Sequence, residues 1–98
     1  MLPRNVASTF AGNELADGVH YSYRFLRDGT FSGVEMGRDL KGRWRADGDE
    51  FCWTWVKPKG QEECMTVQRR GRDIQLLRDG ALFLEGSLTP TRGASSHD

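Results

Sequence analysis

Short runs in which apolar and polar side chains alternate occupy most of the chain, and turn residues separate them. Alternation with a period of two is typical of a strand that buries one face. The dipeptide Asp-Gly, which suits tight hairpin turns because glycine adopts positive φ freely, occurs four times. With these turns as boundaries the sequence predicts about seven strands, at residues 20–26, 30–36, 41–46, 50–56, 62–68, 74–78 and 81–85.

Buried faces restrict how neighbouring strands pair, because a slip of one residue sends every side chain to the other side of the sheet. A turn at Asp47-Gly48 gives one wholly apolar face, with an aromatic ring over a bare strand glycine. The pairs expected on that face are Trp44 with Phe51, Gly42 with Trp53 and Leu40 with Trp55.

The turn at Asp28-Gly29 predicts a second core face in the same way. It leaves Leu26 and Phe31 as an apolar pair on the opposite side of the sheet. The core face would hold Tyr21, Tyr23 and Phe25 together with Met36, Val34 and Ser32.

Sequential antiparallel strands with one apolar face predict an all-β meander that curls into a small barrel or half-barrel, which also reduces exposed edges. A two-layer β-sandwich is the alternative. Ser8 or Thr9 could cap a short N-terminal helical turn that sets Phe10 and Leu15 against one end of the sheet. We expect a single domain over residues 1–88 and a disordered tail over residues 89–98, which have no apolar period.

The two cysteines lie on neighbouring predicted strands. If Met65 and Val67 share a face with Phe51, one allowed register places Cys52 directly opposite Cys64, which predicts a disulfide. The next allowed register makes the two cysteines diagonal, about 7 to 8 Å apart and too far to bridge without distortion. A pair of reduced thiols on the sheet surface is the other alternative.

Charge and composition exclude several classes of function. The 98 residues carry 14 basic and 14 acidic side chains, so no excess of positive charge points to nucleic acid or an anionic membrane. Strand alternation also puts Arg43 and Arg45 on the face opposite Trp44, so rings and cations do not form one stacking platform. No apolar run approaches the roughly 18 residues of a membrane span.

The chemistry-bearing residues do not form a known catalytic or metal motif. Most carboxylates fall at predicted turns, no phosphate-binding or nucleophile motif is present, and two cysteines with two histidines lack zinc spacing. We therefore expect no enzyme activity, no metal and no cofactor. The start of the chain, Met1-Leu2-Pro3-Arg4, lacks the pattern of a secretory signal, which by itself indicates the cytoplasm.

Four stretches carry a resemblance to a group of small exported proteins of unknown function that is common in alphaproteobacteria. The resemblance implies an exported, disulfide-containing β domain, periplasmic or secreted, and no known activity. The stretches are Tyr21 to Gly29, Gly42-Arg43-Trp44, Asp47 to Trp53 and Cys64-Met65-Thr66-Val67.

These observations predict a non-catalytic binding module for a small molecule or an envelope protein. We expect Trp55, Tyr21 and Tyr23 to contact a ligand, because aromatic rings with polar atoms suit an apolar site. A structural or self-associating domain is the alternative. Its interaction surface, which could support a homodimer, would consist of Leu26, Phe31, Leu77 and Leu82.

Overall fold

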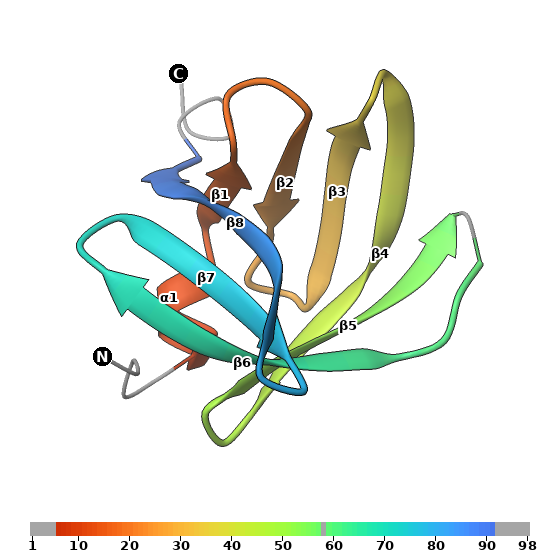
Figure 1. The fold of residues 1–98 in the computed structure, drawn as a ribbon. Coiled ribbons are helices and arrows are strands. Elements are labelled where there is room, and N and C mark those ends of the chain that lie inside the picture. Colours follow the sequence, from red (N-terminus) through yellow and green to blue (C-terminus); the bar gives the residue numbers. More distant parts are fainter. Residues whose placement is uncertain (1–5, 58, 92–98) are drawn as a thin grey trace.

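In the computed structural model, which describes residues 6–57 and 59–91, the chain forms a closed antiparallel barrel of eight strands with one short helix (Figure 1). Each strand pairs with the next along the chain, and β8 pairs with β1 to close the barrel. The helix α1 is Val6–Phe10, and the strands are β1 (Asn13–Ala16), β2 (Tyr21–Phe25), β3 (Thr30–Glu35), β4 (Arg38–Asp47), β5 (Glu50–Lys57), β6 (Glu63–Arg70), β7 (Asp73–Arg78) and β8 (Ala81–Pro90).

The all-β fold, the antiparallel barrel and the short N-terminal helix confirm the sequence prediction, and the barrel is closed rather than half-open. The strand that sequence reasoning missed is β1, whose four residues bury one side chain, Leu15. Ser8 and Thr9 lie within α1 instead of capping it. β8 also extends two residues beyond the expected domain boundary, because Thr89 and Pro90 pair with β1. The tail prediction for residues 92–98 lies outside the described residues.

The β4–β5 hairpin has the predicted core face in a register shifted by two residues. Asp47 pairs with Glu50, so Gly48 and Asp49 form the two-residue turn, and Gly48 has a φ of 64°. Glycine at the first central position is what a type II′ hairpin turn requires. Because the shift is even, every side chain stays on its predicted face. The observed pairs are Ala46 with Phe51, Trp44 with Trp53 and Gly42 with Trp55.

The β2–β3 hairpin differs from the prediction by one residue, and this difference reverses the faces of β3. Phe25 pairs with Phe31, and a four-residue connection, residues 26–29, replaces the expected two-residue turn. In that connection Asp28 Oδ1 accepts hydrogen bonds from the Thr30 backbone N–H and hydroxyl, at 2.9 and 2.6 Å. The prediction that Phe31 lies outside the core is therefore wrong, since its side chain is only 2% exposed.

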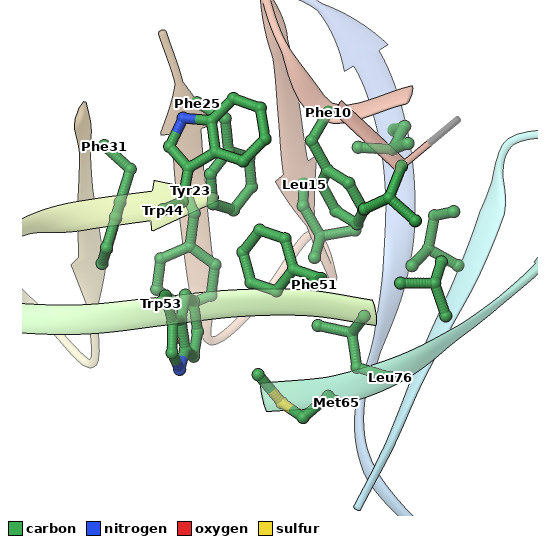
Figure 2. Close-up of a cluster of buried hydrophobic side chains, with 14 of the residues drawn as sticks. Phe10, Leu15, Tyr23, Phe25, Phe31, Trp44, Phe51, Trp53, Met65 and Leu76 are labelled. Carbon is green, nitrogen blue, oxygen red and sulfur yellow. The ribbon is translucent and has the colours of Figure 1, made fainter. Parts of the chain in front are cut away.

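Aromatic rings fill the barrel, and two strand glycines make room for them. A Cβ on Gly42 would lie 2.5 Å from Phe31 Cε1, and a Cβ on Gly33 would lie 2.9 Å from Tyr23 Cδ1. Figure 2 shows the packed aromatic and aliphatic side chains of this core. The buried core residues are Val6, Phe10, Leu15, Tyr23, Phe25, Phe31, Leu40, Trp44, Phe51, Trp53, Met65, Val67, Ile74, Leu76 and Leu88.

Helix α1 packs against β1, β4 and β5 at the start of β1. The Phe10 ring lies 4.5 Å from the Phe51 ring and 5.3 Å from the Phe25 ring, measured between centroids (Figure 2). Phe25 ends β2, and Phe51 lies near the start of β5. Therefore α1 closes the end of the barrel where the β2–β3 and β4–β5 connections lie.

The predicted disulfide between Cys52 and Cys64 is confirmed. The two residues pair directly across β5 and β6, with Phe51 opposite Met65 beside them, and their Cα atoms are 4.0 Å apart. The bond lies on the side of the sheet away from the aromatic core, where Arg45 is the β4 partner of Cys52. Arg45 Nε donates a hydrogen bond to Glu62 Oε2 at 2.8 Å, two residues before Cys64. Disulfides of this kind are typical of proteins that fold in oxidising compartments.

Candidate binding site at the distal end of the barrel

The end of the barrel opposite α1 is called the distal end below. Because successive antiparallel strands reverse direction, the β1–β2, β3–β4, β5–β6 and β7–β8 connections belong to this end. The β1–β2 and β3–β4 connections lie at the top of Figure 1. These four connections therefore lie at the distal end, and the other connections lie at the end that α1 closes.

The three residues predicted to contact a ligand lie together here. The Tyr21 and Tyr23 rings stack with their centroids 4.9 Å apart, and the Tyr23 ring meets the Trp55 ring edge to face at 6.0 Å. Trp53 lies 4.8 Å from Trp55 and 5.1 Å from Tyr23. Tyr21 and Trp55 are half-buried, whereas Tyr23 is only 1% exposed. Only Tyr21 and Trp55 can offer ring surface to a ligand, and Tyr23 supports them from beneath.

Two glutamates accept hydrogen bonds from the polar atoms of Tyr23 and Trp53. Their positions in the strands alternate with those of buried residues. The Tyr23 hydroxyl donates a hydrogen bond to Glu35 Oε2 at 2.7 Å, and Trp53 Nε1 donates one to Glu63 Oε1 at 3.2 Å. Glu63 also pairs with Arg78, at 3.0 Å between Oε2 and Nη1. Buried polar atoms of aromatic side chains need such partners. The sequence signal was strand parity, since Glu35 follows Phe31 and Gly33 at alternate positions and Glu63 precedes Met65 and Val67.

A further hydrogen bond connects β2 with β8. The Tyr21 hydroxyl donates to the backbone carbonyl of Glu85, and the adjacent Gly86 leaves space for it, because a Cβ there would lie 2.7 Å from the Tyr21 oxygen. The polar contacts of the distal end thus involve β2, β3, β5, β6, β7 and β8. The Tyr21 hydroxyl is held by one of these contacts, whereas the Trp55 ring is held by packing against Trp53 and Tyr23.

The charges of nearby carboxylates act on the two tyrosines. Burial, reinforced by the charges of Asp17 and Glu85, raises the pKa of Tyr21 to about 12. Burial, followed by the hydrogen bond and charge of Glu35, raises the pKa of Tyr23 well above its ordinary value. Both phenols therefore remain neutral donors at physiological pH.

Asp17 organises the β1–β2 connection beside Tyr21. Its Oδ1 accepts hydrogen bonds from the backbone N–H groups of Val19, His20 and Tyr21, and its Oδ2 lies 2.8 Å from His20 Nδ1. Desolvation acts to raise the pKa of Asp17, but these hydrogen bonds outweigh it and hold the pKa well below the ordinary range. The carboxylate is therefore ionised under ordinary conditions.

Most of the exposed large apolar side chains belong to connections or strand ends of the distal end. Seven large hydrophobic residues are exposed among the described residues, and Leu26 in the β2–β3 connection is the one at the α1 end. Met36, at the β3–β4 turn, is 73% exposed. The other five are Val19, Val34, Val56, Leu82 and Phe83, which lie in connections or near strand ends of the distal end.

The interaction surface predicted from the sequence does not form one patch. Leu77 and Leu82 pair across β7 and β8, next to the distal β7–β8 connection. Leu26 lies in a connection at the α1 end, and Phe31 is buried in the core. The one-residue difference in the β2–β3 register accounts for the burial of Phe31, and Leu26 is separated from Leu77 and Leu82 because they lie at opposite ends of the barrel.

Several hollows lie on the surface of the barrel. One of about 380 Å³ runs over β2, β3 and β4 beside Arg24, Ser32 and Lys41. Among the described residues, Glu50, Cys52 and Cys64 bring potential metal-binding atoms together, but the disulfide engages both sulfurs. These features therefore add no site comparable to the aromatic one at the distal end.

Fold and site together define a small, closed, eight-stranded meander barrel with a helix at one end and partly exposed aromatic rings at the other. In the part of the chain that the structure describes, no helix is long and apolar enough to cross a membrane. Comparisons with protein-family models, with curated proteins and with solved structures found no match.

Proposed function

We propose that this protein is a non-catalytic binding module, periplasmic or secreted, that binds a partner protein at the distal end. The observation that carries the proposal is the concentration of exposed large hydrophobic residues there, six of the seven among the described residues. Exposed apolar clusters on a small soluble domain mark interaction sites.

The packed interior favours binding on the distal end rather than inside the barrel. Tyr23, Phe31 and Trp53 are each 2% exposed or less, and their rings are in mutual contact. Barrels that carry a small ligand keep an internal cavity, whereas side chains fill this one. Residues spread over several connections suit a protein surface better than a single small molecule.

The disulfide supports the envelope location. Cytosolic reductants keep most thiols reduced, so a structural disulfide suits a periplasmic or extracellular protein. The same location supplies the envelope proteins among which we expect the partner.

Site-specific photocross-linking tests the proposal. A photoreactive p-benzoylphenylalanine replaces Met36 in one variant and Leu26, which is 39% exposed at the other end of the barrel, in the matched control. We expect a defined cross-linked product in cells from the Met36 variant and none from the Leu26 variant. Equal products from both positions, or none from Met36, would overturn the proposal.

Self-association is the second candidate, because Leu82 and Phe83 are exposed next to each other on β8 and Leu82 pairs with Leu77. Sedimentation equilibrium of the wild-type protein and of Leu82→Asp tests it. A dimer that Leu82→Asp dissociates would favour this candidate, and a monomer at every concentration would exclude it.

A further inference from the structure

Glu35 lies at the distal end, and none of the described basic side chains forms an ion pair with it. Its Oε2 accepts the Tyr23 hydroxyl, which is a neutral donor. Arg38 is its cross-strand partner on β4, but no ion pair joins the two among the described side chains. By contrast, Glu63 is paired with Arg78. Among the side chains that the structure describes, Glu63 thus has a contacting cation and Glu35 has none.

Aromatic rings lie near this carboxylate. Met36, which follows it in the chain at the β3–β4 turn, is exposed, whereas Val34 lines the hollow over β2, β3 and β4 on the outer wall. The Tyr23 ring that binds Glu35 stacks on Tyr21 and meets Trp55, and these two rings are partly exposed. The face of an aromatic ring attracts a cation that lies within about 6 Å of its centroid. The surroundings therefore favour a cation that is also partly apolar.

We propose that the distal end binds an arginine side chain of the partner protein, with the guanidinium against Glu35 and beside the rings of Tyr21 and Trp55. Arginine fits better than lysine because its planar, weakly hydrated guanidinium stacks on aromatic rings and bonds carboxylates through two N–H groups. An apolar residue next to that arginine would contact Met36. The inference rests on the proposed function and names the chemistry of its partner.

Two peptides that differ only in charge test the inference. Acetyl-Val-Arg-Leu-amide carries the guanidinium, and acetyl-Val-citrulline-Leu-amide replaces it with a neutral group of nearly the same shape. Titration is followed by NMR at the Trp55 indole N–H and the Met36 methyl group. We expect the arginine peptide to shift both signals and to bind at least about fivefold more tightly than the citrulline peptide.

Glu35→Gln provides the matched variant, because a glutamine oxygen can still accept the Tyr23 hydroxyl and preserve the core. Glu50→Gln, in β5 near the α1 end, is the control. Glu35→Gln is expected to weaken the arginine peptide by about fivefold or more, and Glu50→Gln to leave it unchanged. Far-UV circular dichroism and the Trp53 indole signal establish that both variants are folded.

Equal binding of the two peptides, unchanged binding to Glu35→Gln, or no shift at the distal end would overturn the inference. Its failure is separable from that of the proposed function when Glu35→Gln is added to the Met36 cross-linking variant. If the cross-linked product still forms with Glu35→Gln, the arginine inference is wrong but the distal end remains the binding site. If the Met36 variant without Glu35→Gln gives no product, the proposed function itself is wrong.

Discussion

Replacement of both cysteines by alanine is expected to cost the protein a large share of its stability. Cys52 and Cys64 are 12 residues apart in the chain and pair directly across β5 and β6. Four residue pairs join these two strands, from Glu50 with Thr66 to Trp53 with Glu63. The disulfide therefore reinforces one of the shorter ladders of the barrel, next to the aromatic core.

The magnitude follows from the loop that the disulfide closes. In the chain-entropy model, a cross-link across about 12 residues restricts the unfolded chain by roughly 3 kcal/mol at 25 °C. Domains have a total free energy of unfolding of about 5–15 kcal/mol. Loss of the disulfide would therefore remove roughly a fifth or more of the stability.

Urea denaturation followed by tryptophan fluorescence measures this loss. With an m-value of about 1–2 kcal/mol per molar urea, the midpoint of Cys52→Ala/Cys64→Ala is expected to fall by roughly 2 M. The wild-type protein in reductant is the matched control and should show a similar fall. A loss below about 1 kcal/mol by both routes would refute the entropic reasoning, because the reasoning assigns most of the effect to the unfolded chain.

Two further predictions concern the core and the distal tyrosines. Gly42→Ala is expected to destabilise the protein by about 1–3 kcal/mol or more in the same urea assay, because the new Cβ would meet the Phe31 ring and the Thr54 carbonyl; a loss under about 0.5 kcal/mol would contradict this packing. The raised pKa values of Tyr21, at about 12, and of Tyr23 favour their neutral forms in the folded state, so stability is expected to be full below pH 10 and to fall as pH rises toward 12. Urea midpoints between pH 9 and 12 should fall less steeply for Tyr21→Phe/Tyr23→Phe than for wild type, and an equal slope would refute the assignment.

Strand parity is the part of the fold that sequence reasoning predicted best. Alternation and Asp-Gly turns predicted the antiparallel barrel, and the Asp79-Gly80 turn occurs with both residues at positive φ, between the paired Arg78 and Ala81. Parity also limited the β5–β6 pairing to even registers, one of which sets Cys52 opposite Cys64, and the structure has that register. These results depend on local alternation, which a short stretch of sequence contains.

Register and closure required the tertiary structure. The length of the β2–β3 connection depends on the hydrogen bonds of Asp28 and on the space that Gly42 leaves for the Phe31 ring, and together they turn Phe31 inward. Strand β1 is too short to be recognised alone, and pairing with both β2 and β8 stabilises it.

The candidate site was likewise predicted in part from the sequence and decided in part by the tertiary structure. Sequence reasoning predicted Tyr21, Tyr23 and Trp55 as ligand contacts, and the structure brings their rings together, although binding itself stays a prediction. The sequence by itself determined which side chains of a strand share a face, because alternation sets that, but the face of β3 that turns inward followed from the observed register. Only the closed barrel decided that Glu35 and Glu63 meet the aromatic rings at one end, because those contacts join strands that are distant in the chain and depend on register to a single residue.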